Sequence, residues 1–95
     1  MSLYRRAARR DANEQEIIDA LEAIGASVQT ISERGVPDLL VGYRGRNWLI
    51  EVKDGSKPPS KRKLNAEQEQ WHRAWRGQVR VVSSVDAAVA LVSWG

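Results

Sequence analysis

The chain has 95 residues, enough for one domain, and a domain of this size buries only about 60–65% of the surface that its unfolded chain exposes. It contains no cysteine, which excludes disulfides and thiolate metal sites and fits a reducing cytoplasm. The basic N-terminus is followed by charged sequence, and no stretch approaches the roughly 18 apolar residues of a membrane span, so we expect neither a secreted nor a membrane protein. Small domains commonly bury more surface by oligomerisation, and we expect a homodimer.

The net charge of +3 is unevenly distributed. Residues 1–10 form a basic N-terminal arm, and residues 54–63 are predicted to form a flexible loop rich in Gly, Pro and Ser. Clustered Lys and Arg bind phosphate backbones by releasing condensed counterions, so nucleic acid is a candidate partner; the alternative is a solvated tail and a solvated loop. The two segments hold eight of the 15 Lys and Arg residues: Arg5, Arg6, Arg9, Arg10, Lys57, Lys61, Arg62 and Lys63.

Apolar periodicity predicts a first helix over residues 11–25, with Asp11 as its N-cap and Glu14 three residues later in a capping-box arrangement. The order αβββαβα, without repeats, predicts a single α/β domain over residues 1–95 with a mixed central sheet flanked by helices. After the first helix, the predicted elements are strands at 27–31, 38–43 and 48–53, a helix from 64 to 77, a strand at 79–82 and a helix at 85–92.

Residues 38–53 are predicted to form a β-hairpin, and the length of its loop decides which residues face each other. A two-residue loop at 44–45 places Asp38 opposite Glu51, whereas a four-residue loop at 44–47 places Asp38 opposite Lys53. Side chains alternate along a strand, so in both cases these three residues share one face of the hairpin. The opposite face is apolar and holds Leu39, Val41, Trp48, Ile50 and Val52.

Two carboxylates on opposed strands repel each other unless a cation lies between them. Mg²⁺ is typically held by one or two carboxylates together with water and substrate phosphate oxygens, so Asp38 and Glu51 are candidate metal ligands. Lys53 can orient an attacking water or stabilise a phosphorane, and the set is suited to phosphodiester hydrolysis. The alternative is an ordinary hairpin, with a surface pair of Glu51 and Lys53 and with Asp38 ending a turn after Pro37.

Two polar residues lie on the apolar faces of predicted helices. Glu14 can complete the capping box, act as a third carboxylate at the metal, or do both. Gln68 shares its face with Trp71 and Trp75, and it can satisfy backbone at a strand end or contact the catalytic centre or DNA. We expect the two tryptophans in the core; the alternative is that they are platforms on which bases stack. We expect His72 on the surface, where without a second His or Cys it cannot anchor a zinc site.

These motifs resemble the PD-(D/E)XK nuclease superfamily, in particular stand-alone VRR-NUC domains of phage type, and archaeal Holliday junction resolvases are similar too. The resemblance covers residues 11 to about 92 and includes the helical Glu14. It rests on GVPDLLVG entering a strand, LIEVK leaving the next strand and LNAEQEQW opening a helix.

The resemblance implies a restriction-endonuclease-like core and dependence on Mg²⁺ or Mn²⁺. By position, Asp38 and Glu51 would be metal ligands with the backbone carbonyl of Val52, Glu14 would complete the site, and Lys53 would orient the water. It also implies 5′-phosphate and 3′-hydroxyl products, and homodimers that act on branched or structured DNA in the cytoplasm of a bacterial host. The alternatives are a true four-way junction resolvase and a non-catalytic DNA-binding module with the nuclease fold, in which the basic arm and loop carry the function.

Overall fold

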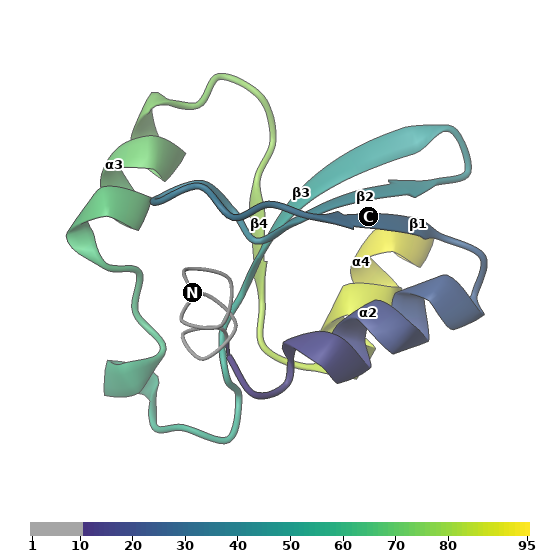
Figure 1. Ribbon diagram of the computed structural model, residues 1–95, viewed down its shortest axis with the longest axis horizontal. Helices are drawn as coiled ribbons and strands as arrows, with labels where there is room; N and C mark the ends of the chain where they lie inside the picture. Colours follow the sequence, from purple (N-terminus) through teal and green to yellow (C-terminus); the bar gives the residue numbers. More distant parts are fainter. Residues whose placement is uncertain (1–10) are drawn as a thin grey trace, which may run out of the picture.

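The computed structural model describes residues 11–95, and the basic arm, residues 1–10, lies outside the described residues. The elements follow the predicted order αβββαβα, with one short 3-10 turn added after β3 (Figure 1). They are α2 (Glu14–Ala23), β1 (Ser27–Thr30), β2 (Leu39–Tyr43), β3 (Arg46–Val52), η1 (Pro59–Lys61), α3 (Ala66–Ala74), β4 (Arg80–Val82) and α4 (Val85–Trp94).

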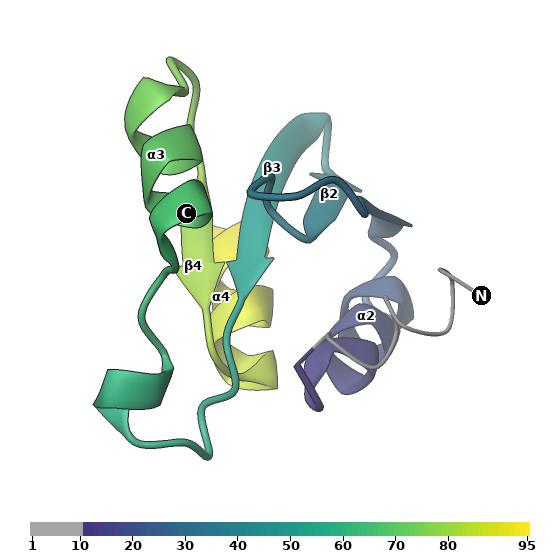
Figure 2. The same ribbon diagram turned by 60° about the vertical axis from the view of Figure 1, so that its left-hand side comes forward.

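The four strands form one mixed sheet in the order β1-β2-β3-β4. The first three strands are antiparallel neighbours, and β4 pairs in parallel with β3. Helices α2 and α4 pack together on one side of the sheet, while α3 lies apart from them in both views (Figures 1 and 2). This arrangement confirms the predicted α/β fold with a mixed sheet flanked by helices.

A two-residue turn joins β2 to β3, which decides between the two predicted loop lengths. The ladder pairs Tyr43 with Arg46 at the turn and Leu39 with Ile50 at the other end. Arg44 and Gly45 have φ angles of 52° and 78°, and two successive positive φ angles are the requirement of the type I′ turn, whose twist matches that of the strands. The register therefore brings Asp38 beside Glu51.

The core lies between the sheet and the pair of helices α2 and α4. The predicted apolar face of the hairpin is fully buried there, as are Ile17 and Leu21 of α2. Burial of this kind stabilises by about 25 cal/mol per Å² of apolar surface. Besides Ile17 and Leu21, the core consists of these hydrophobic residues: Ala26, Leu39, Val41, Trp48, Ile50, Val52, Val82, Ala88 and Val92.

The start of α2 differs from the prediction. The helix begins at Glu14 with Asn13 as N-cap, and no side chain caps it, so the capping box of Asp11 and Glu14 is wrong. The reason is a tertiary contact: Asn13 Nδ2 donates to the backbone carbonyls of Lys53 at 3.1 Å and Ser83 at 3.2 Å. Asn13 thereby ties the beginning of α2 to the ends of β3 and β4.

The prediction of two core tryptophans on α3 is also wrong. Trp71 is half-buried, and Trp75 is 45% exposed. The two rings stack on each other, with centroids 4.6 Å apart and planes inclined by 17°. Because α3 does not pack on the α2 and α4 side of the sheet, its two tryptophans stack on each other instead of entering the core.

None of the helices found in residues 11–95 is both long and apolar enough to cross a membrane.

Candidate active site

Asp38 and Glu51 meet at the open end of the hairpin. Asp38 follows the buried Pro37 and directly precedes β2. Its Oδ2 accepts a hydrogen bond from the backbone N–H of Val52 at 2.8 Å, which fastens the carboxylate to the end of β3. The sequence predicted this juxtaposition from strand alternation, and the two-residue turn produces it.

Glu51 is an acid buried in an environment that disfavours its charge. It is only 1% exposed, whereas its neighbours in β3 that fill the core are all apolar. The pKa of Glu51 is raised from its ordinary value of 4.5 to about 9, mainly by burial and also by the nearby Asp38 carboxylate, while Lys53 acts in the opposite direction. A buried carboxyl beside a second carboxylate is a strong candidate for cation binding.

Lys53 directs its ammonium group toward Glu51. Lys53 Nζ lies 4.0 Å from Glu51 Oε2, and the lysine side chain is only 13% exposed. Nζ also donates a hydrogen bond of 2.9 Å to Gln68 Oε1. The positive charge is thus held close to the Glu51 carboxyl, and the geometry does not fit the alternative of a solvated surface pair.

Gln68 connects α3 to both Glu51 and Lys53. Its Nε2 donates to Glu51 Oε2 at 2.9 Å, and its Oε1 accepts from Lys53 Nζ and from the backbone N–H of Asn65, also at 2.9 Å. The sequence left open whether this amide satisfies backbone at a strand end or contacts the catalytic centre or DNA. It accepts from a backbone N–H, which belongs to the N-cap of α3 and not to a strand end, and it contacts two of the candidate site residues.

His72 lies one helical turn beyond Gln68 and belongs to the same cluster, so its expected surface position is wrong. Its side chain is 14% exposed, and Nε2 lies 3.8 Å from Glu51 Oε1. Burial lowers the pKa of His72, and the nearby Lys53 ammonium lowers it further, which favours the neutral imidazole. The sequence signal that could have found it is the i, i+4 spacing from Gln68, which puts both side chains on one face of α3.

Asp11 is a further acid whose position the sequence did not reveal. Burial raises its pKa, Lys53 acts to lower it and Asp38 to raise it, so its carboxyl is close enough to sense both groups. Glu14, the predicted third carboxylate, is 4% exposed and faces inward as expected. Both acids lie near the beginning of α2, which Asn13 fastens to the backbone of Lys53.

The donor set suits a small hard cation. Glu51 Oε1 is buried and accepts no hydrogen bond from a described residue, so a lone pair remains for a ligand. Asp38 and Glu51 offer carboxylate oxygens, which Mg²⁺ and Mn²⁺ prefer. Within residues 11–95, no group of three or more His, Cys, Asp or Glu residues has the geometry of a metal site, so the fit is to an ion held by two acids and completed by water and substrate oxygens.

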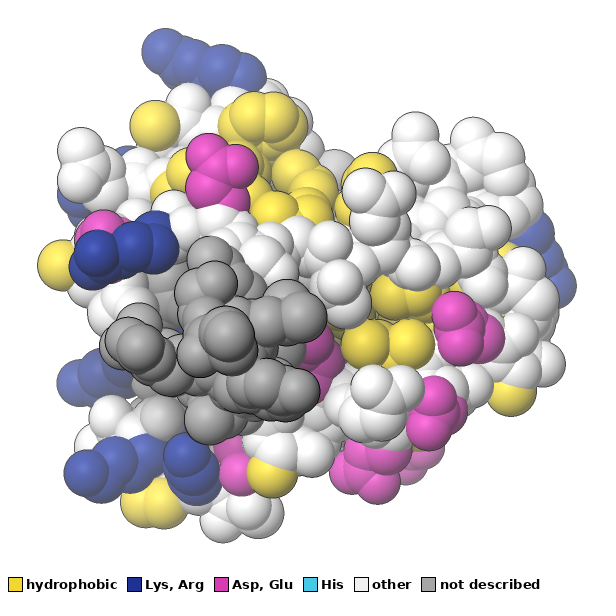
Figure 3. Space-filling model, viewed as in Figure 1, with side chains coloured by type: hydrophobic (Ala, Val, Ile, Leu, Met, Phe, Trp, Pro, Cys, Tyr) yellow, Lys and Arg dark blue, Asp and Glu magenta, His cyan; other side chains and the backbone are white. Residues whose placement is uncertain are grey.

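The basic residues of segment 54–63 lie outside this cluster, on the surface. Lys57, Lys61 and Lys63 are exposed, and Arg62 is half-buried. The predicted flexible loop contains the 3-10 turn η1, which begins after Pro58. In Figure 3, most visible Lys and Arg side chains lie along the margin that carries α3 and segment 54–63, with a few acids among them, and a further group of Asp and Glu lies over α2. The predicted DNA contacts at Arg5, Arg6, Arg9 and Arg10 fall outside the described residues.

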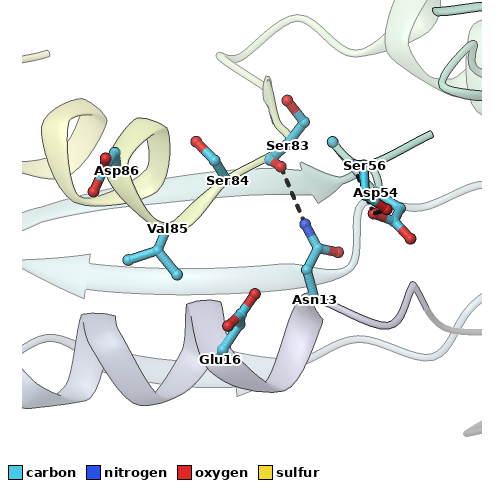
Figure 4. Close-up of a pocket in the computed structure, with 9 residues that line it drawn as sticks. Asn13, Glu16, Asp54, Ser56, Ser83, Ser84, Val85 and Asp86 are labelled. Atoms are coloured by element: carbon cyan, nitrogen blue, oxygen red, sulfur yellow. Dashed lines mark hydrogen bonds between the residues drawn. The ribbon is translucent and has the colours of Figure 1, made fainter. Parts of the chain in front are cut away.

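A separate pocket lies where the N-terminal ends of α2 and α4 meet segment 54–56 (Figure 4). Asn13 crosses it to reach the carbonyl of Ser83. Its charged lining residues are acids, namely Glu16, Asp54 and Asp86, so it repels phosphate. The pocket includes none of Asp38, Glu51 and Lys53, and the cluster at the open end of the hairpin is the better candidate for chemistry on nucleic acid.

Comparisons with known proteins agree with this geometry. No family model matches the sequence, and no curated protein matches it significantly. Among solved structures, the chain is similar to one described as a VRR_NUC domain, with 30% sequence identity and a TM-score of 0.61. The similarity covers 86% of this chain and 96% of that one.

Proposed function

This chain belongs to the VRR-NUC domains, which have the PD-(D/E)XK nuclease fold, and from that premise we propose that it is a metal-dependent endodeoxyribonuclease. Its substrate is branched or structured DNA, in which it hydrolyses phosphodiester bonds. The observation that carries the proposal is the buried cluster of Glu51, Asp38 and Lys53 at the open end of one hairpin.

In this proposal, the carboxylates of Asp38 and Glu51 and the backbone carbonyl of Val52 hold Mg²⁺ or Mn²⁺, and Glu14 acts through a water molecule. The bound ion supplies Lewis-acid activation of the scissile phosphate. The raised pKa of Glu51 supports the assignment, because a cation beside a buried carboxylate replaces the solvation that burial removed.

Lys53 performs two tasks in the reaction. Its ammonium group donates a hydrogen bond to the attacking water and so orients the lone pair of that water toward phosphorus. It also places positive charge beside the phosphorane, whose negative charge increases in the transition state. The hydrogen bond to Gln68 restrains Nζ before substrate binds, so less ordering is required during the reaction.

Binding and cleavage are assigned to different residues. Lys57, Lys61, Arg62 and Lys63, together with the arginines of the basic arm, contact the phosphate backbone without reading sequence. Clustering of basic side chains beside α3 supports this division, because the acidic surface over α2 would repel DNA (Figure 3).

The decisive experiment is cleavage of labelled four-way, flap, splayed and linear duplex DNA with Mn²⁺, with Asp38→Ala as the matched control. We expect the wild-type protein to cut branched substrates and the variant to cut none. Exclusive cutting of four-way junctions would identify a junction resolvase. DNA binding without cutting of any substrate, in wild type and variant alike, would contradict the proposal and favour a non-catalytic DNA-binding module.

We also propose that the active form is a homodimer. Large apolar side chains remain exposed in the single chain, among them Trp94 at 85% and Val81 at 48%. Exposed apolar surface of this kind is common at interfaces between subunits. Sedimentation equilibrium at micromolar concentration should give twice the chain mass of 10.7 kDa, and a monomer mass throughout the active concentration range would refute the dimer.

A further inference from the structure

One side-chain amide serves both the N-terminal cap of α3 and the catalytic cluster. Asn65 and Gln68 form a reciprocal capping box: Asn65 Oδ1 accepts from the backbone N–H of Gln68, and Gln68 Oε1 accepts from the backbone N–H of Asn65, both at 2.9 Å. The same Gln68 side chain hydrogen-bonds to Glu51 and Lys53. Asn65 is exposed, and the hydrogen bond that its side chain accepts from the backbone N–H of Gln68 links it to the cluster.

The cap decides which way the Gln68 amide points. A backbone N–H can only donate, so the atom facing Asn65 N must be the oxygen of the amide. The NH₂ group must then face Glu51, and Lys53 must share the oxygen with Asn65. If the amide were flipped, its NH₂ group would face two other donors, the backbone N–H of Asn65 and the ammonium group of Lys53. Its oxygen would then face the carboxyl group of Glu51. Capping thus selects the one orientation that satisfies Glu51 and Lys53 together.

The first turn of α3 is also fixed against the segment that leads to Asp38. Gly35 adopts a φ of +78°, and a Cβ atom there would come within 3.1 Å of the carbonyl oxygen of Glu67. Arg34 forms a salt bridge of 3.0 Å with the Glu67 side chain. The cap of α3 therefore lies between the two halves of the site, in contact with the approach to β2 on one side and with β3 residues on the other.

We propose that Asn65 is a positioning residue of the nuclease site, acting through Gln68 to fix the Glu51 carboxylate and the Lys53 ammonium group. This inference rests on the proposed nuclease function. Loss of the Asn65 side chain loosens the first turn of α3, the Gln68 amide samples other orientations, and the hydrogen bonds to Glu51 and Lys53 are made only part of the time. The chemical step slows, while binding to the DNA backbone is unchanged.

The test compares two N-cap residues of the same chain. Asn65→Ala removes the cap of α3, and Ser84→Ala removes the cap of α4. Ser84 Oγ accepts from the backbone N–H of Ala87 at 3.1 Å, and among residues 11–95 no side-chain hydrogen bond joins it to Glu51, Lys53 or Gln68. Asn65→Asp restores an oxygen acceptor and should rescue the cap, since Asp and Asn are comparable N-caps. For each variant, kcat and KM on branched DNA, thermal stability and exchange of the Gln68 side-chain amide protons are measured.

We expect Asn65→Ala to lower kcat about fivefold, the factor that corresponds to loss of a typical N-cap, with KM within about twofold of wild type. Asn65→Asp should recover most of kcat, and Ser84→Ala should lose comparable stability with kcat unchanged. Equal kcat in the two alanine variants would overturn the inference, because the cap would then act only on stability.

The amide protons separate this inference from the proposed function. In the wild type, Gln68 Nε2 protons should be protected from solvent exchange, and Asn65→Ala should remove the protection while Ser84→Ala does not. This readout needs no cleavage. If no variant and no wild-type protein cuts DNA, the proposed function fails, and the exchange data still decide whether the cap orients the amide.

Discussion

Glu51 makes the stability of the protein depend on pH. Its pKa is about 9 in the folded chain and 4.5 when unperturbed. Below pH of about 4.5 the group is protonated in both states, so it has no effect on the unfolding free energy. Between pH of about 4.5 and 9 the unfolded chain releases a proton that the folded chain retains. In this range Glu51 therefore lowers the unfolding free energy as the pH rises, by up to about 1.4 kcal/mol for each pH unit.

Glu51→Gln should therefore stabilise the metal-free protein at neutral pH while abolishing cleavage. The amide keeps an oxygen for Gln68 Nε2 but carries no charge to desolvate. We expect a gain of about 1–3 kcal/mol at pH 7 and little gain at pH 4.5. Urea denaturation in the presence of a chelator at pH 4.5, 7 and 9 measures the unfolding free energy of both proteins. If that free energy changed with pH in the same way in wild type and variant, the pKa of Glu51 in the folded chain would not be raised.

Lys53→Met should separate chemistry from binding. Methionine keeps the apolar stem but removes the ammonium group, so transition-state stabilisation is lost while the basic surface beyond the site is intact. We expect cleavage to fall by at least about 100-fold and DNA affinity to change less than about twofold. Single-turnover kinetics and fluorescence anisotropy on the same labelled DNA provide both values. A loss of affinity that accounts for the loss of cleavage would reassign Lys53 to binding.

At the level of single residues, the sequence predicted those whose positions follow from local geometry. Strand alternation placed Asp38, Glu51 and Lys53 on one face because all three belong to one hairpin. Asp11 and His72 were missed because long-range packing of α2 and α3 brings them to the site. The spacing N-x-x-Q from Asn65 to Gln68 was a readable capping-box signal, although nothing in it predicts the hydrogen bonds to Glu51 and Lys53.

At the level of elements, segment 54–63 and its turn η1 are expected to carry part of the DNA affinity. Neutralising Lys61, Arg62 and Lys63 together should weaken binding of all DNA substrates. It should also reduce the slope of log K against log salt by up to about 0.9 for each phosphate group that the protein no longer neutralises. The slope is obtained from binding titrations between low and physiological salt.

Arg44→Ala is the matched control for the triple variant, because Arg44 is an exposed cation in the turn at the far end of the hairpin from Asp38 and Glu51. It should leave the salt slope almost unchanged. An effect of the turn variant about one third as large as that of the triple variant, in proportion to the charge removed, would indicate that only net charge matters.

The helices show where sequence patterns reach their limit. The apolar periodicity of α2 and α4 predicted helices that cover the sheet, and both do so. The same periodicity on α3 predicted buried tryptophans, but the pattern gives the apolar face of a helix and not the surface that it meets. The hairpin loop was ambiguous for a related reason: Arg at a positive φ is uncommon, so Arg44 and Gly45 carry a weaker turn signal than Asn-Gly.

At the level of the whole molecule, divalent metal should act as a folding ligand. An ion that binds the folded site and not the unfolded chain stabilises by RT ln(1 + [M]/Kd), or about 2.7 kcal/mol at 100 times Kd. We expect Mn²⁺ to raise the melting temperature of the wild type by several degrees, and calorimetry to give a matching Kd.

Asp38→Asn should abolish this stabilisation, because it removes one of the two carboxylates while its amide oxygen can still accept from Val52 N. The Ser84→Ala protein should retain the full response to Mn²⁺. An unchanged Mn²⁺ shift in Asp38→Asn would remove Asp38 from the ligand set.

The alternation of core and site residues along β3 restricts where the chain can gain or lose residues. Trp48, Ile50 and Val52 fill the core, while Glu51 lies between them on the reactive face. Deleting a single residue such as Leu49 would move every later side chain of the strand to the opposite face of the sheet. The carboxylate of Glu51 would then point into the core and Val52 would point away from it. Descendants of this sequence can therefore exchange side chains along β3, but insertions and deletions must fall in the connecting segments, because within the strand one missing codon disrupts the hydrophobic core and the candidate active site together.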